Sequence, residues 1–110
     1  MPRVLIPLAP GFEELEAITI IDLLRRAQIE VVSAGLAAGP VTASRGTAVV
    51  PDTTLDAVLS QSFDLIVLPG GQPGSNNLEA DARVQRLLKQ QHAAHKTVAA
   101  ICAAPKVLAS

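Results

Sequence analysis

Residues 64–71 read Asp-Leu-Ile-Val-Leu-Pro-Gly-Gly, and this stretch decides the fold. A short continuous apolar run that ends at Pro69 predicts a strand buried on both faces, as the strands of a parallel sheet are. The pair Gly70-Gly71 closes the strand, and glycines let a backbone approach a ligand closely. We therefore expect the central strand of a sheet here, with a functional edge at its carboxyl end.

Strand and helix patterns alternate on both sides of this segment. Apolar runs predict further strands at residues 4–8, 30–34 and 97–101. Periodic apolar residues predict helices at residues 12–28 and 78–94, and a strand pair is expected at residues 41–43 and 47–50. Strands that alternate with helices of this length form βαβ units with right-handed crossovers. The predicted fold class is α/β with a mainly parallel sheet.

Composition narrows the classes of function. The chain has 110 residues, 49% of them hydrophobic, and a formal net charge of −1. This charge argues against a nucleic-acid footprint, and no apolar run reaches the ~20 residues of a membrane span. One cysteine and two histidines exclude a disulfide framework and an ordinary zinc site. We expect a soluble, cytoplasmic domain without a cofactor, and the first residues make a poor signal peptide.

The carboxyl end of the chain predicts a longer domain. The strand at residues 97–101 leads into a helical start that runs only to Ser110. A parallel sheet needs helices on both faces, and little chain is left to cover one of them. We therefore expect residues 1–110 to be the N-terminal part of a single domain that continues.

Two carboxylates fall on the apolar face of the first helix. At about 100° per residue, one face of this helix forms an apolar stripe that is predicted to be buried, and Glu14 is predicted to face water. The stripe contains Ala17, Ile20, Ile21, Leu23, Leu24 and Ala27. Glu13 and Glu16 are the only charged residues inside this stripe. A buried carboxylate is costly unless it is hydrogen-bonded or protonated, so a functional role is one interpretation. The other is that acids in a first turn complement the helix dipole.

Cys102 lies at the end of a predicted strand, where a new helix begins. Ala100 and Ala104 are small enough for the tight strand-to-helix turn of a nucleophile elbow. Such a turn places the sulfur at the carboxyl edge of the sheet and at a helix N-terminus, which favours the thiolate. Glu16 and the amide of Gly71 are expected at the same edge. An inert buried thiol is the alternative.

Neither histidine can activate this cysteine. His92 and His95 end the helix that precedes the last strand, so they lie at the opposite edge of the sheet. A cation-capable side chain is favourable at a helix C-terminus, which is their expected role. A histidine partner for Cys102 must come from beyond Ser110.

These residues resemble the ThiJ/PfpI superfamily, in particular its DJ-one branch with the bacterial deglycase and chaperone members. The matching segments are residues 8–17 (LAPGFEELEA), 21–26 (IDLLRR), 44–46 (SRG), 67–71 (VLPGG) and 99–105 (AAICAAP). The resemblance implies a flavodoxin-like, doubly wound parallel sheet in three α/β/α layers. It also implies a homodimer, no cofactor or metal, and subunits longer than this chain.

The resemblance also implies a role for each site residue. Cys102 is the oxidation-prone nucleophile, Glu16 the acid that hydrogen-bonds its sulfur, and Gly71 and Ala103 the amide donors of an oxyanion site, with Glu13 as a neighbouring acid and Arg45 as a basic residue near the pocket. The histidine of the family, downstream of the elbow, has no counterpart in this chain.

Two functions fit these residues. The first is a cofactor-independent glyoxalase or deglycase that acts on methylglyoxal-type dicarbonyls or their adducts. The alternative is an oxidative-stress sensor and redox-regulated chaperone that uses the same cysteine. A peptidase is disfavoured because Ala103 follows the cysteine, and a glutamine amidotransferase because Ala100 and Ala104 replace glycines. In either function we expect the proton of the pair on Glu16, donated to a Cys102 thiolate.

Overall fold

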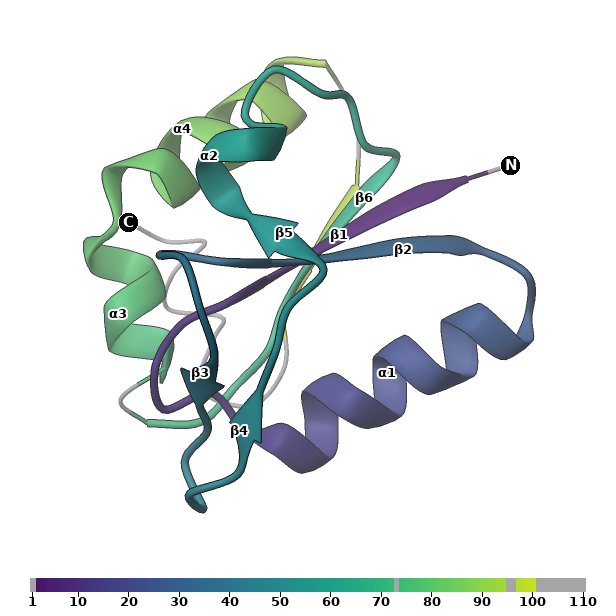
Figure 1. The fold of residues 1–110 in the computed structure, drawn as a ribbon. Coiled ribbons are helices and arrows are strands. Elements are labelled where there is room, and N and C mark those ends of the chain that lie inside the picture. Colours follow the sequence, from purple (N-terminus) through teal and green to yellow (C-terminus); the bar gives the residue numbers. More distant parts are fainter. Residues whose placement is uncertain (1, 73, 95–96, 101–110) are drawn as a thin grey trace.

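The computed structural model describes residues 2–72, 74–94 and 97–100 (Figure 1). Its strands are β1 (Arg3–Leu8), β2 (Glu30–Gly35), β3 (Val41–Thr42), β4 (Ala48–Val49), β5 (Thr53–Thr54), β6 (Leu65–Leu68) and β7 (Thr97–Ala100). Its helices are α1 (Glu14–Arg26), α2 (Leu55–Val58), α3 (Gly74–Ala80) and α4 (Ala82–Ala93). Five strands form one parallel sheet in the order β5-β2-β1-β6-β7. The predicted α/β fold with a parallel sheet is confirmed.

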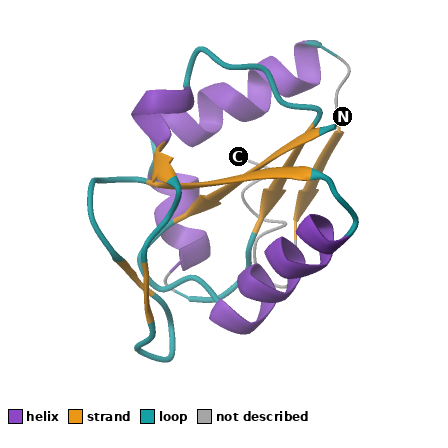
Figure 2. Cartoon of the chain, turned by 45° about the vertical axis from the view of Figure 1, so that its right-hand side comes forward, coloured by secondary structure: helices purple, strands orange, loops and turns teal. Residues whose placement is uncertain are grey.

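The sheet lies between two layers of helices. Helix α1 covers one face, and α2, α3 and α4 cover the other (Figures 1 and 2). Strand β1 supplies both cores because its side chains alternate between the faces. Leu5 packs with α2, α3 and α4, whereas Ile6 packs with Ala17 and Ile21 of α1. Coverage on both faces explains why the strands are continuous apolar runs.

The predicted second helix is two helices in the structure. Residues 74–77, which precede the predicted helix, form the start of α3, and Asp81 interrupts the helical run. The Asp81 carboxylate accepts hydrogen bonds from the backbone N–H groups of Arg83 and Val84, which makes Asp81 the N-cap of α4. Strand β5 and helix α2 were not predicted, because two residues and one helical turn carry too little periodicity.

The buried stripe of α1 is narrower than the sequence predicts. Ala17 and Ile21 are buried, and Ile20 and Leu24 are half-buried. Leu23 is 58% exposed and Ala27 is also exposed, so the prediction was wrong for both. Ala27 is the C-cap and lies past the last helical turn, and Leu23 lies at the margin of the stripe, next to Asp22.

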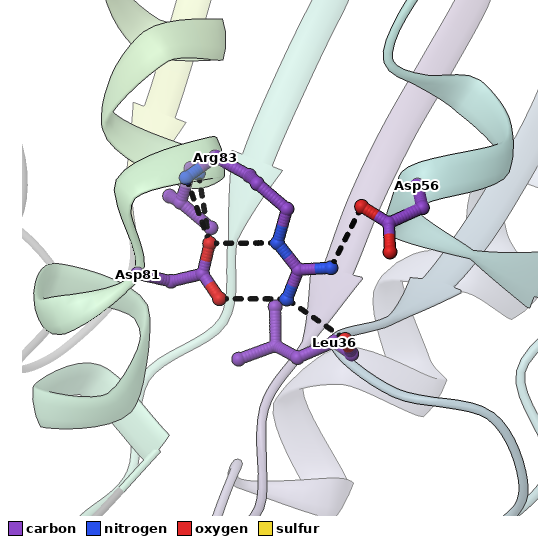
Figure 3. Close-up of polar contacts among 5 residues, drawn as sticks. Leu36, Asp56, Asp81 and Arg83 are labelled. Carbon is purple, nitrogen blue, oxygen red and sulfur yellow. Dashed lines mark hydrogen bonds and ion pairs between the residues drawn. The ribbon is translucent and has the colours of Figure 1, made fainter.

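Arg83 joins helix α4 to helix α2 and to the end of β2 (Figure 3). The sequence did not single out this residue. Its guanidinium contacts the Asp81 carboxylate at 2.8 Å, the Asp56 carboxylate at 3.0 Å and the Leu36 carbonyl at 2.8 Å. The side chain of Asp81 is only 15% exposed. The hydrogen bond from the Arg83 side chain lowers the pKa of Asp81, although burial opposes this shift. Hydrogen bonds to Asp81 and Asp56 in turn raise the pKa of Arg83.

Replacing Arg83 with methionine should therefore destabilise the full-length protein by about 1–3 kcal/mol at neutral pH. The folded pKa of Asp81 is depressed, so its contribution is present above its ordinary pKa and is lost as pH falls through the folded pKa. The difference between the variant and the wild type should then shrink below about pH 4. Urea unfolding as a function of pH measures this. Arg26→Met is the control, because its ion pair with Asp22 is exposed and contributes at most about 1 kcal/mol; equal losses in both variants would contradict the prediction.

Candidate functional site

The carboxyl edge of the sheet is built from two neighbouring turns. One follows β1 and leads through Gly11 into α1, and the other follows β6 at Gly70 and Gly71. The backbone N–H of Glu13 donates to the Gly70 carbonyl at 2.8 Å, which ties the two turns together. In open α/β sheets, ligands bind outside the carboxyl ends of the strands, so this edge is the candidate site.

Glu16 points from the first turn of α1 toward the turn after β6. One oxygen of its carboxylate accepts a hydrogen bond from the backbone N–H of Gly70 at 3.2 Å. The residue is half-buried. The carboxylate of Glu16 therefore lies at the carboxyl edge of the sheet, as the helical stripe predicted, and a backbone donor compensates part of its desolvation.

Glu13 is the N-cap of α1. Its carboxylate accepts from the backbone N–H of Leu15 at 3.2 Å, and its own backbone is extended. This capping bond supplies a structural reason for an acid at position 13. A supporting role of Glu13 in the chemistry stays a prediction.

Gly71 occupies a position that only glycine fits. Its φ is +97°, and a Cβ at this position would lie 2.6 Å from the backbone nitrogen of Glu13. In the described part of the chain, no acceptor pairs with its backbone N–H. The oxyanion role of that N–H, which the resemblance implies, stays a prediction.

Helix α3 packs against the same edge, which the sequence did not predict. Gly74 donates its backbone N–H to the Gly11 carbonyl at 3.2 Å, and a Cβ on Gly74 would lie 2.7 Å from the Cα of Phe12. The Asn77 side-chain amide donates to the Pro10 carbonyl at 2.6 Å. The turn after β1 is therefore held between α3 and the turn after β6. Gly74 and Asn77 fell in or next to a stretch rich in Gly, Pro, Ser and Asn, which hid their role.

Arg45 lies in the turn between β3 and β4, and its side chain is exposed. Its backbone N–H donates to the carboxylate of Glu14 at 3.1 Å. Glu14 is half-buried, and its carboxylate bonds to this turn, a contact that the helical wheel did not predict. The predicted role of Arg45 near a pocket remains a prediction.

Cys102 and Ala103 lie outside the described residues, as does His95. Strand β7 is described as far as Ala100, which pairs with Leu68 of β6. His92 lies in the last turn of α4, ahead of β7 in the chain, in agreement with its predicted place in the fold. Among the cavities that described residues line, one of about 330 Å³ includes Gln61, Phe63 and Gln91, and another of about 210 Å³ includes Pro10 and Leu36.

Two kinds of feature are absent from the described residues. No group of three or more metal-ligating side chains is found among them. None of their helices has both the length and the apolar character needed to cross a membrane.

The doubly wound parallel sheet with glycine-rich turns at its carboxyl edge defines a flavodoxin-like α/β protein. The chain belongs to the DJ-1/PfpI family, whose model matches residues 2–110. It is 50% identical over 106 residues to protein dj-1beta of Drosophila melanogaster, with 96% of this chain and 57% of that protein covered. The crystal structure of Drosophila melanogaster DJ-1beta superposes with a TM-score of 0.96 at 48% identity, over 98% of this chain and 59% of that one.

Two further relatives bear on function. The glutathione-independent glyoxalase DJR-1.2 of Caenorhabditis elegans is 40% identical over 96 residues, which cover 87% of this chain and 51% of that protein. The structure of oxidized Toxoplasma gondii DJ-1 has a TM-score of 0.95 at 42% identity and covers 98% of this chain and 59% of its own. The chain thus spans a little over half the length of each of these relatives.

Proposed function

We propose that the full-length protein is a cofactor-independent glyoxalase or deglycase that converts methylglyoxal-type dicarbonyls, or their adducts, through Cys102. The observation that carries this proposal is the Glu16 carboxylate, half-buried and hydrogen-bonded to the Gly70 N–H at the carboxyl edge. An acid held at this edge is what a thiol nucleophile needs for proton transfer. The relative in Caenorhabditis elegans named as a glyoxalase supports the same chemistry.

Strand register supports the pairing of Glu16 with Cys102. Leu68 pairs with Ala100, and Cys102 follows Ala100 by two residues as Gly70 follows Leu68. Glu16 is hydrogen-bonded to Gly70, which lies two residues past the end of β6.

The proposed reaction is an internal redox isomerisation with addition of water. The Cys102 thiolate attacks the aldehyde carbon of methylglyoxal and forms a hemithioacetal. Glu16 then moves a proton between carbon and oxygen, so that the aldehyde carbon is oxidised to a thioester while the ketone is reduced to an alcohol. Water cleaves the thioester, which releases lactate and the thiol. The amides of Gly71 and Ala103 would stabilise the oxyanion in the first and last steps.

Incubating the full-length protein with methylglyoxal and assaying lactate tests the proposal. The wild type should form lactate, and Cys102→Ala should form none above the buffer blank because the covalent intermediate cannot form. Equal yields from the two proteins would refute the proposal. The same assay with an amine or thiol adduct of methylglyoxal separates a deglycase from a glyoxalase that uses only the free dicarbonyl.

A second candidate is a redox sensor with chaperone activity at the same cysteine. The Toxoplasma relative has been solved in an oxidized form, which favours this alternative. Amide and carboxyl donors beside a thiolate stabilise its sulfenic and sulfinic acids through hydrogen bonds. Mild peroxide should then add the mass of two oxygen atoms at Cys102, and Glu16→Leu should lower that yield. A peptide map with no oxygen on Cys102 would count against the sensor.

We also propose a cytoplasmic homodimer. Helix α1 exposes three large apolar side chains, Leu15 at 74%, Ile18 at 43% and Leu23 at 58%. Exposed apolar surface of this kind is typical of contact sites between proteins. Sedimentation equilibrium of the full-length protein measures its subunit number, and a monomer would contradict this part of the proposal.

A further inference from the structure

Glu14 anchors the hairpin of β3 and β4 to the first turn of α1. Its carboxylate accepts hydrogen bonds from the Ser44 hydroxyl at 3.2 Å, from the Arg45 N–H at 3.1 Å and from the Thr47 N–H at 3.3 Å. The pKa of Glu14 is lowered overall. Burial raises this pKa, but hydrogen bonds outweigh the effect of burial. They come from the backbones of Glu14, Arg45 and Thr47 and from the Thr47 side chain. The group is therefore a carboxylate at neutral pH, and charged acceptors make the stronger hydrogen bonds.

Glu14 and Glu16 hold the first turn of α1 from two sides. Two residues of a helix are about 200° apart, so their side chains leave the helix in nearly opposite directions. Glu14 bonds to the hairpin, and Glu16 bonds to the Gly70 N–H. Two backbone hydrogen bonds of 2.8 Å hold the same turn. Ser44 N–H donates to the Phe12 carbonyl, and Glu13 N–H donates to the Gly70 carbonyl.

Packing alone orients this turn weakly. Of the first four residues of α1, only Ala17 is buried, and Leu15 is 74% exposed. An alanine fills little volume, so it resists rotation of the helix less than a large side chain would. The polar bonds of Glu14 and Glu16, together with the two backbone bonds, therefore contribute to the orientation of the turn about the helix axis.

We propose that Glu14 is a positioning residue for the site: by fixing the first turn of α1 to the hairpin, it sets where the Glu16 carboxylate lies relative to Cys102. This inference rests on the pairing of Glu16 with Cys102 in the proposed function. Loss of the Glu14 carboxylate would leave the hairpin unanchored on that side and let the turn rotate. A displacement of about 1 Å at a catalytic group can reduce a rate by up to roughly 10²-fold.

Titration of the Cys102 thiol in the full-length protein tests the proposal, with thiolate absorbance followed against pH. Glu16→Leu removes the donor to sulfur and should raise the thiol pKa. Glu14→Ala should raise it in the same direction by part of that shift, and should add nothing in the Glu16→Leu background, as a double-mutant cycle requires for residues that act in series. Glu14→Gln keeps one acceptor for the hairpin and should give a smaller shift, with a rate of lactate formation closer to the wild type.

Two controls keep the test decisive. Asp22→Ala on the same helix removes an exposed carboxylate and should leave the thiol pKa unchanged. Amide hydrogen exchange at residues 44–47 should become faster in Glu14→Ala, and by less in Glu14→Gln, which shows that the anchor was lost or weakened in a folded protein. Faster exchange with an unshifted thiol pKa in Glu14→Ala, alongside a shifted one in Glu16→Leu, would overturn the positioning role. A wild type that forms no lactate refutes the proposed function instead, because the titration needs no turnover.

Discussion

Replacing Glu16 with glutamine is expected to lower the rate of lactate formation by roughly 10²- to 10⁴-fold in the full-length protein. Glutamine has nearly the same shape and can still donate a hydrogen bond to sulfur, but it cannot accept and release the proton of the hemithioacetal. The thiolate of Cys102 should therefore persist while turnover is lost. Because an amide oxygen can still accept the bond from the Gly70 N–H, the loop after β6 should stay in place.

Steady-state kinetics with methylglyoxal measure this effect, and the thiol titration accompanies each variant. Asp22→Asn makes the same carboxylate-to-amide change on an exposed face of α1 and should leave kcat unchanged. Glu16→Leu removes both the proton and the donor, so kcat should fall and the thiol pKa should rise. A Glu16→Gln enzyme with wild-type kcat would show that another group carries the proton.

The sheet could be predicted because its strands carry their own signal. Residues 66–68 are buried in a parallel sheet that is covered on both faces, so with the half-buried Leu65 they form an apolar run that needs no tertiary information to recognise. The same holds for β1. The strand and helix of residues 53–58 were missed because they are held mainly by neighbours: Thr53 pairs with Ala34 of β2, and Leu55 is fully buried by the core.

The candidate site could be predicted in part. The position of Glu16 followed from helical geometry, which placed an acid on the sheet-facing side of α1. The role of Glu14 could not follow, because its partners Ser44 and Arg45 lie 30 and 31 residues away on a hairpin. A helical wheel uses only the residues of the helix itself. It therefore places a polar residue on the solvent-exposed face even where a loop from elsewhere in the chain covers that face. Glu13 is the N-cap of α1, which gives the acid a structural reason, and its functional role stays a prediction.

Gly71→Ala is expected to lower the free energy of unfolding by about 3–4 kcal/mol, through two separate costs. The φ of +97° is disfavoured for any residue with a Cβ. The new Cβ would also lie 2.6 Å from the backbone nitrogen of Glu13 and 3.0 Å from the carbonyl oxygen of Gly11. These are backbone atoms of a turn held by hydrogen bonds to Gly70 and Thr42, so they cannot move aside as a flexible side chain could.

Gly46 separates the two costs. Its φ is +92°, almost that of Gly71, but no heavy atom lies within 4 Å of the Cβ that alanine would add. Gly46→Ala therefore has the backbone cost alone, about 1–2 kcal/mol. Denaturant unfolding of both variants in the full-length protein measures the difference, which is the cost of pushing the turn after β6 away from the turn after β1. Because Glu13 N–H donates to Gly70 across this contact, the same displacement should move Gly70 from Glu16 and reduce kcat in Gly71→Ala but not in Gly46→Ala. Equal destabilisation and equal kcat in the two variants would show that the close approach of the two turns contributes nothing to the site.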